Sequence, residues 1–204
     1  MVSAVVQSIL LSFGLILPLG VQNIFVFNQG VTQPQLTRAL PAILTASLCD
    51  TLLISLAVLG TSIVILAAPI AKTVLFASGI LFLLYMGFVT WSRRPSTDRN
   101  PEQALSSKEQ IAFTASVSLL NPHAILDTVG VIGTNAITYG GAERLVFTLG
   151  CVLVSWIWFF TLAIAGNQVG KFDRTGTVVV LLNKVSAMII WGTAVYLLVL
   201  LITT

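Results

Sequence analysis

The sequence predicts an all-α polytopic membrane protein with six transmembrane helices, arranged as two inverted three-helix repeats in which helices one and four are broken. Of the 204 residues, 56% are hydrophobic and only 8% are charged, whereas typical soluble domains carry about 25% charged residues. Long intervals contain no charged residue, and one polar stretch divides the chain into similar halves. This composition excludes a soluble globular domain, a disordered chain and a small disulfide-rich module.

The charge-free intervals locate the spans. Asp, Glu, Lys and Arg are missing from residues 1–37, 51–71, 73–92, 145–170 and 185–204. A helix needs about 20 mainly apolar residues to cross roughly 30 Å of hydrocarbon, and apolar runs without period-two alternation favour helices over barrel strands. The first stretch follows no basic segment and is too long for a cleaved signal peptide, so we expect it to be a span. The six expected spans are residues 3–27, 38–66, 70–92, 110–136, 144–166 and 182–202.

The only long polar stretch, from Arg93 to Gln110, separates two halves with three apolar segments each. We expect a single transporter domain over 1–204, made of a first repeat (1–92), a cytoplasmic loop (93–109) and a second repeat (110–204). Because each half has an odd number of helices, the second half must insert upside down relative to the first, as in inverted-topology transporters.

Lysine and arginine predict the orientation, because short cytoplasmic loops are enriched in them. With six spans, the loops after spans one, three and five lie on one side and carry eight of these residues, whereas the other side carries Lys72 and Arg144. We therefore expect the eight-charge side to be cytoplasmic and both termini to be extracytoplasmic. A five-span arrangement with one re-entrant segment stays open, because span four contains a break. The eight residues are Arg38, Arg93, Arg94, Arg99, Lys108, Lys171, Arg174 and Lys184.

Proline interrupts two expected spans at polar sites. Proline has no backbone N–H and frees a carbonyl on the preceding turn, which costs several kcal/mol in hydrocarbon unless another group satisfies it. One interpretation is a kink repaired by local side chains. The clustered amides favour another, a discontinuous helix whose N-terminal dipole faces an anionic group in a polar cavity. The expected helix-break residues are Pro18, Gly20 and Pro122, and the polar residues beside them are Gln22, Asn23, Asn121 and His123.

Two carboxylates lie within expected spans: Asp50 near the middle of span two, and Asp127 five residues after Pro122. An acid near the membrane centre costs at least about 2.5–3.5 kcal/mol on insertion scales, so by default it marks a functional site. No Lys or Arg lies near mid-depth to neutralise either acid. We expect each to be protonated when the site is empty or to bind a cation, which suits exchange of protons for a positively charged solute. Pro18 and Pro122 fall at comparable depth in their halves, and aligning them places Asn23 opposite Asp127.

The remaining candidates are weaker. His123, the only histidine, can relay protons or act as a neutral hydrogen-bonding partner at the break. Cys49 and Cys151 are isolated, so we expect no metal or redox site. Gly166 and Gly170 form a GxxxG pattern that permits close helix approach but is frequent by chance. The sequence contains no phosphate-binding glycine loop, no nucleophile–base constellation and no concentrated basic face. We therefore expect no enzyme, no cofactor and no nucleic-acid partner.

Three segments resemble the LysE-type amino-acid exporters of the LysE/RhtB superfamily. ILPLGVQN at 16–23, continued by FVFNQG at 25–30, is similar to the first-helix motif of that family. NPH at 121–123, followed by LDT at 126–128, is similar to its fourth-segment motif, and LCDT at 48–51 to its acidic second helix. The resemblance covers nearly the whole chain. Val21 replaces the usual second proline and Ile125 an aromatic residue common in lysine and arginine exporters, which leaves the substrate open.

The resemblance implies a multi-pass protein of the bacterial inner membrane that exports basic amino acids, chiefly lysine and arginine, within a superfamily that also exports other amino acids. Combined with the chemistry above, it predicts alternating access coupled to a cation, with the proton favoured over sodium, and two halves that rock around the site. Asp50 and Asp127 would bind the cationic groups of the solute, and the helix N-termini with Gln22, Asn23 and Asn121 its carboxylate.

Other functions stay open: export of other amino acids or of a metal or inorganic cation, a channel, or a membrane scaffold. The expected partners are an amino-acid substrate, a coupling cation and the lipid bilayer. The small-residue helix faces also leave a homodimer open.

Overall fold

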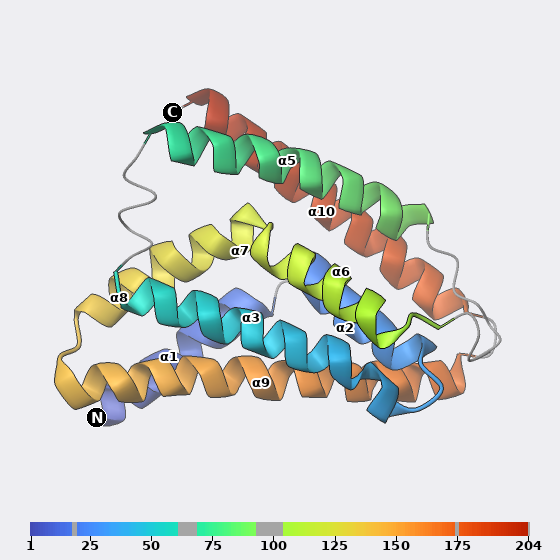
Figure 1. Ribbon diagram of the computed structural model, residues 1–204, viewed down its shortest axis with the longest axis horizontal. Coiled ribbons are helices and arrows are strands. Elements are labelled where there is room, and N and C mark those ends of the chain that lie inside the picture. Colours follow the sequence, from blue (N-terminus) through green and yellow to red (C-terminus); the bar gives the residue numbers. More distant parts are fainter. Residues whose placement is uncertain (18–19, 61–68, 93–103, 174–175, 204) are drawn as a thin grey trace.

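The computed structural model describes residues 1–17, 20–60, 69–92, 104–173 and 176–203, and every element in these ranges is helical (Figure 1). The all-α prediction is therefore confirmed. The first half contains α1 (Val2–Ile16), α2 (Val21–Thr32), the short 3₁₀ helix η1 (Leu36–Ala39), α3 (Leu40–Val58) and α5 (Pro69–Ser92). The second half contains α6 (Ser107–Leu119), α7 (Pro122–Asp127), the π-helix η2 (Thr128–Gly133), α8 (Thr134–Ile137), α9 (Gly141–Phe172) and α10 (Thr177–Thr203).

Length and apolarity identify three helical segments that can each cross a membrane: Leu36–Val58, Gly141–Phe172 and Val179–Val199. A fourth candidate is the pair α1 and α2, which meets the same criteria together but bends by 79° at its break. Ala77–Ser92 and Thr128–Ile137 are shorter apolar helices. Within the described ranges the protein is thus a multi-pass membrane protein with three to four such candidates, and the six-span arrangement stays a prediction.

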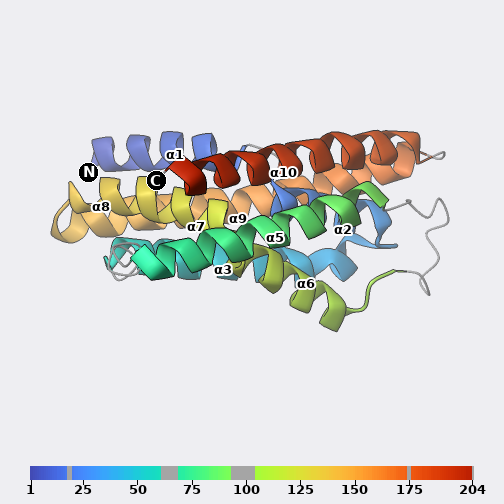
Figure 2. The ribbon, with the colours of Figure 1, turned by 90° about the horizontal axis from the view of Figure 1, so that it is seen from above.

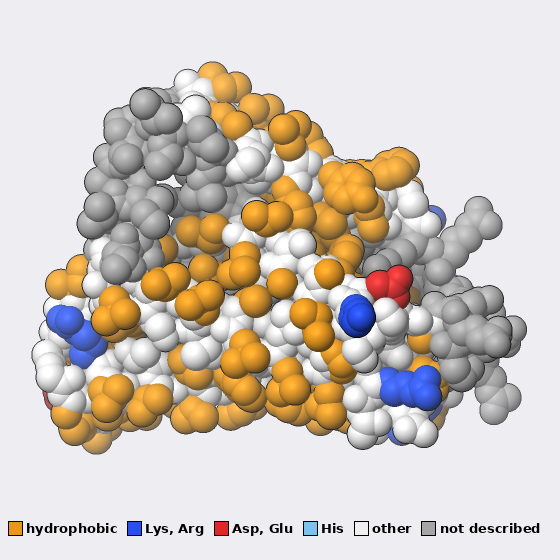
Figure 3. Space-filling view, in the orientation of Figure 1, with side chains coloured by type: hydrophobic (Ala, Val, Ile, Leu, Met, Phe, Trp, Pro, Cys, Tyr) orange, Lys and Arg blue, Asp and Glu red, His pale blue; other side chains and the backbone are white. Residues whose placement is uncertain are grey.

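The chain runs back and forth along the long axis of the molecule. In Figure 1, α1 with α2, then α3, α5, the α6–α8 series, α9 and α10 follow that axis in alternating directions, and both termini lie at the same end. Arg38 in η1, Lys108 in α6 and Lys171 in α9 belong to the opposite end. On the face shown in Figure 3, hydrophobic side chains cover the middle, whereas Lys and Arg side chains lie toward the two ends.

The closest helix packing joins the two halves of the chain. In the first half, α2 and α1 pack against α9, α3 packs against α6 and α9, and α5 packs against α10. Each of these pairs combines an element of residues 1–92 with one of residues 107–203. The halves therefore interlock instead of forming two separate three-helix bundles.

Small residues allow α2 and α9 to approach closely. A Cβ atom added to Gly30 would lie 2.2 Å from the carbonyl oxygen of Ala163, and one added to Gly166 would lie 2.2 Å from that of Phe27. Side chains at either glycine would push the two helices apart. Gly166, which the GxxxG pattern had singled out, is therefore a packing residue of this seam.

The helices α5 and α10 form a unit that contacts the other helices only sparsely (Figures 1 and 2). Within the unit, Trp191 fits over Gly87, where an added Cβ would lie 2.2 Å from the indole nitrogen. The Trp191 ring also stacks on Trp91, with ring centroids 5.6 Å apart, and the Lys184 ammonium lies over the Trp91 ring.

This unit, the α5–α10 pair, meets the rest of the bundle through an apolar cluster and through hydrogen bonds. The cluster joins residues of α5 and α10, such as Leu83 and Ile190, to Val21 and Ile24 of α2. The Asn28 amide of α2 donates a buried 2.7 Å hydrogen bond to the Asn183 carbonyl oxygen of α10, and the Val179 N–H of α10 donates a 3.1 Å hydrogen bond to the Asp173 carboxylate after α9.

Candidate functional site

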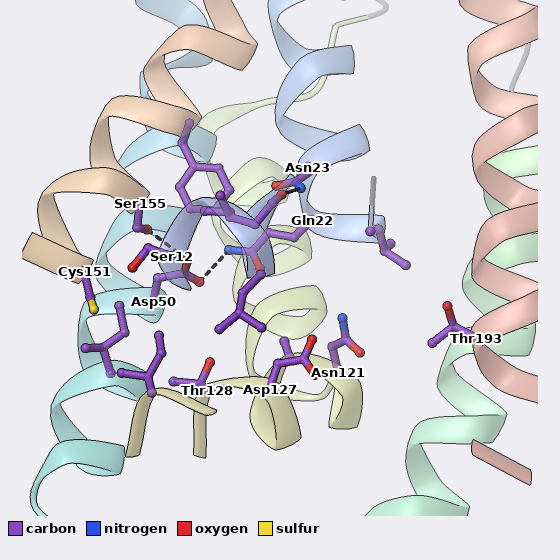
Figure 4. Close-up of a pocket in the computed structure, with 18 of the residues that line it drawn as sticks. Ser12, Gln22, Asn23, Asp50, Asn121, Asp127, Thr128, Cys151, Ser155 and Thr193 are labelled. Atoms are coloured by element: carbon purple, nitrogen blue, oxygen red, sulfur yellow. Dashed lines mark hydrogen bonds between the residues drawn. The ribbon is translucent and has the colours of Figure 1, made fainter. Parts of the chain in front are cut away.

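The two predicted helix breaks meet at one cavity. The first helix ends at Ile16 and resumes as α2 at Val21, and the fourth segment ends at Leu119 and resumes as α7 at Pro122. Pro18 itself lies outside the described residues. The cavity has a volume of about 180 Å³ and draws its lining from α1, α2, α3, α5, α7, η2, α9 and α10 (Figure 4). The polar lining residues are Ser12, Gln22, Asn23, Asp50, Asn121, Asp127, Thr128, Ser155 and Thr193.

Asp50 occupies the wall between α2 and α9. The Gln22 side-chain amide donates a 3.0 Å hydrogen bond to Oδ1 of Asp50, and the Ser155 hydroxyl donates a 2.9 Å hydrogen bond to Oδ2. Both donors are neutral, so neither balances the charge of the carboxylate. Each carboxylate oxygen can accept a further hydrogen bond. The arrangement holds the acid in a fixed position and leaves acceptor capacity for a cation.

The start of α2 contributes backbone donors to the cavity. Gly20, Val21 and Gln22 line the cavity, and no side chain caps the N-terminus of α2 at Gly20. The first N–H groups of a helix have no partner within the helix and carry its positive dipole end. The Asn23 side-chain amide donates a 2.6 Å hydrogen bond to the carbonyl oxygen of Ile16, the last residue of α1. Asn23 therefore bridges the break, as the local-repair interpretation of the kink anticipates.

The second break places another carboxylate on the same cavity. Asn121 is buried directly before α7, and Asp127 at its end is half-buried; both line the cavity with Asp50 (Figure 4). The chain continues into the π-helix η2, whose Thr128 and Ile132 also line the cavity. Such π segments are rare and frequently lie at functional sites. The side chain of His123, an expected site residue, lies outside the described part of the structure.

Sequence reasoning missed four hydroxyl residues of the cavity: Ser12, Thr128, Ser155 and Thr193. Thr128 belongs to the LDT segment that follows NPH, which is a signal the sequence did offer. Serine and threonine in apolar helices usually bond to their own backbone, so nothing in the sequence separates the other three from the remaining hydroxyl residues. Ser155 and Cys151, four residues apart on one face of α9, both line the cavity. Cys151 is a buried free thiol that belongs to the wall of the cavity.

An apolar helical bundle with two broken segments that meet at a carboxylate-bearing cavity belongs to the class of polytopic membrane transport proteins. Residues 13–200 match the family described as LysE type translocator. The chain therefore belongs to the LysE family of amino-acid transporters.

Curated relatives cover nearly the whole chain. A Bacillus subtilis protein, YisU, provisionally named an amino-acid transporter, is 53% identical over 95% of this chain and 88% of its own length. The arginine exporter protein ArgO of Serratia proteamaculans is 32% identical, and that of Pectobacterium atrosepticum is 31% identical. These alignments cover 97% of both chains for the first and 94% of both chains for the second. No solved structure matches the chain.

Proposed function

We propose that the protein exports basic amino acids, lysine or arginine, across the bacterial inner membrane. The observation that carries the proposal is Asp50, which faces the cavity and is held by the neutral donors Gln22 and Ser155. A carboxylate placed this way recovers its lost hydration when a cationic solute binds. The relatives named as arginine exporters support the same substrate class.

The cavity offers complementary groups for both ends of such a solute. The first-turn amides of α2 and the side chain of Asn121 would bind the solute carboxylate, because helix N-termini favour anions. Asp50 and Asp127 would bind its cationic groups. When the solute leaves, protons taken up from outside would neutralise the two acids and be released inside, so that export is coupled to proton entry.

The topology of the proposal has six spans in two inverted repeats, with both termini outside the cell. The common location of the termini in Figure 1 supports an even number of crossings. Three basic residues of the predicted cytoplasmic loops lie at the other end, which supports the orientation: Arg38, Lys108 and Lys171.

The packing suggests which parts move during alternating access. Two interlocked halves cannot rock as rigid bodies without breaking the α2–α9 and α3–α6 contacts. The α5–α10 pair is joined internally by Trp191 and attached to the bundle mainly by an apolar surface, with the Asn28–Asn183 hydrogen bond as its buried polar contact, so it can tilt at a smaller cost. We therefore propose that this pair moves against the other helices and opens the cavity, whose wall it completes with Leu83, Ile190 and Thr193.

Counterflow in proteoliposomes tests the function. Purified protein should exchange internal lysine or arginine for the labelled amino acid, and an outward-acidic pH gradient should accelerate net efflux. Asp50→Asn and Asp127→Asn should each abolish this exchange. Full arginine and lysine transport by both variants would refute the site, whereas exchange of neutral amino acids only, or of an inorganic cation, would refute the substrate class.

Distances between spin labels test the moving unit. Tyr85 on α5, Tyr196 on α10 and Leu153 on α9 are well exposed, and both native cysteines are buried, so cysteines introduced at these positions can be labelled selectively. Substrate should change the 85–153 and 196–153 distances and leave the 85–196 distance constant. Residues 85 and 48 belong to the first half of the chain, and residues 196 and 153 belong to the second. If the 85–196 distance changes while the 85–48 and 196–153 distances stay constant, the two halves rock against each other instead. The label at Leu48 on α3 supplies the matched reference within the first half.

A further inference from the structure

Ser155 differs from the other hydroxyl residues of α9 in the direction of its hydrogen bond. Thr148 and Thr161 donate to the carbonyl oxygens of Arg144 and Ile157, four residues earlier on the same helix. Ser155 is buried and donates across to Asp50 on α3. A hydroxyl has one hydrogen and two lone pairs, so the Ser155 oxygen keeps its acceptor capacity beside the carboxylate.

Ser12 on α1 is a second hydroxyl with unused capacity. Its neighbour one turn earlier, Ser8, donates to the carbonyl oxygen of Val5. The Ser12 oxygen is shielded from water and bonds to no oxygen or nitrogen atom among the described residues, and its polar neighbour there is the Cys151 thiol. The adjacent Cys151 thiol is only a weak donor and acceptor. A thiol is a weaker partner than an oxygen or nitrogen atom, so the Ser12 hydroxyl keeps capacity for a stronger hydrogen bond.

Neighbouring residues of α9 bring the Ser12 and Ser155 hydroxyls and Asp50 to the same part of the cavity wall. Ser12 lies beside Cys151, Ser155 lies beside Asp50, and Cys151 and Ser155 are neighbours one helical turn apart on the same face. Side chains spaced in this way have Cβ atoms about 5–6 Å apart. Figure 4 draws Ser12, Asp50 and Ser155 on one wall of the cavity.

We propose that Ser12, Asp50 and Ser155 form a subsite for a primary ammonium group of the transported amino acid. The proposal rests on the proposed function and assigns a ligand group to one wall of that site. A primary ammonium has three hydrogens in a pyramidal arrangement and no acceptor. Helices α1, α3 and α9 each offer it one oxygen acceptor, and Asp50 adds the opposite charge. A guanidinium group is planar, so it can pair with the two Asp50 oxygens but cannot direct hydrogens to acceptors on three helices in a pyramidal arrangement.

The ammonium group has two sources in this substrate class, the α-ammonium of every amino acid and the side-chain ammonium of lysine. Competition against labelled arginine counterflow separates them, with lysine, arginine and Nα-acetyl-lysine as unlabelled competitors. If the subsite binds the α-ammonium, Ser12→Ala and Ser155→Ala should raise the inhibition constants of lysine and arginine alike, by about tenfold or more. If it binds the side-chain ammonium, the variants should weaken lysine and Nα-acetyl-lysine and leave arginine unchanged.

Two further variants keep the test decisive. Thr161→Val removes a hydroxyl of the same helix that bonds only to its own backbone in the described contacts, and it should leave every inhibition constant unchanged. Ser155→Thr retains the hydroxyl and should retain the affinity that Ser155→Ala loses, which separates binding from folding. Unchanged constants in both alanine variants would overturn the ammonium subsite while the proposed function stands. Failure of the wild-type protein to exchange any amino acid would overturn the proposed function itself.

Discussion

The spacing of the α2–α9 seam should control both stability and transport, and Gly30→Ala tests this directly. The two helices run in the same direction in Figure 1. Gln22 precedes Gly30 by eight residues on α2, and Ser155 precedes Ala163 by eight residues on α9, which corresponds to about 12 Å along each helix. The contact at Gly30 and the two donors that hold Asp50 are therefore separated by the same distance along both helices. A side chain at the glycine should disturb the acid site two turns away.

The structure gives the size of the disturbance. The Cβ atom that Gly30→Ala introduces would lie 2.2 Å from the Ala163 carbonyl oxygen, and real Cβ contacts essentially never fall below 3.0 Å, so the seam must open by at least about 0.8 Å. Hydrogen bonds of 3.0 and 2.9 Å to Asp50 can lengthen by only a few tenths of an ångström before they weaken. Overpacking of this kind costs about 1–3 kcal/mol, partly offset by the better helix propensity of alanine, about 1 kcal/mol.

Unfolding in mixed detergent micelles, followed by tryptophan fluorescence, measures the stability, and arginine counterflow measures the half-saturation concentration. Gly30→Ala should lower the free energy of unfolding and weaken substrate binding. Gly192→Ala on α10 is the matched control, because nothing lies within 4 Å of its Cβ position, and it should be neutral or slightly stabilising. A Gly30→Ala protein with wild-type stability and wild-type transport would refute this account of the seam.

Three other predictions concern groups around the site and the helix ends. Asp50→Ala should be less stable than Asp50→Asn, because alanine leaves the Gln22 and Ser155 donors unpaired at about 1–3 kcal/mol each; equal unfolding free energies would contradict it. Asn183→Ala should destabilise the protein by about 1–3 kcal/mol, because Asn28, whose Oδ1 already has no described partner, loses the acceptor of its amide. The additional change Asn28→Ala should recover part of that loss, and a strictly additive double variant would argue against the link. Hydrogen bonds from Ser106 lower the pKa of Glu109 in the capping box of α6. The ionised Glu109 therefore stabilises the start of α6 at a pH above the ordinary pKa of glutamate. This stabilisation is lost as the pH falls through the lowered pKa that Glu109 has in the folded protein. The protection factors of the first-turn amides of α6, measured against their intrinsic exchange rates at each pH, should therefore fall in acid for the wild type and depend less on pH in Ser106→Ala, and identical profiles would contradict the cap.

The class of the protein and the location of its breaks could be predicted from the sequence because both depend on local properties. Apolar runs of spanning length define helices in a membrane whatever their neighbours are, and the helix interruptions lie where Pro18 and Pro122 predicted them. Asp50 stood out because a carboxylate in a membrane span is costly and therefore indicates a functional site. The helix ends were less accurate: α9 spans Gly141–Phe172, although 144–166 was expected, because polar and glycine residues at both ends continue the helix.

Only the tertiary structure determined which helices pack against each other. The equal division of the sequence did not indicate that α2 pairs with α9, α3 with α6, and α5 with α10. Asn23 was expected to bind substrate; it lines the cavity, and the sequence did not reveal that its amide also contacts the Ile16 carbonyl. Ser12 and Ser155 had no sequence signal, since a serine that bonds to its own helix and one that faces a carboxylate on another helix look alike in sequence. Hydropathy and proline chemistry act over neighbouring residues, whereas the wall of a cavity depends on which helix faces which.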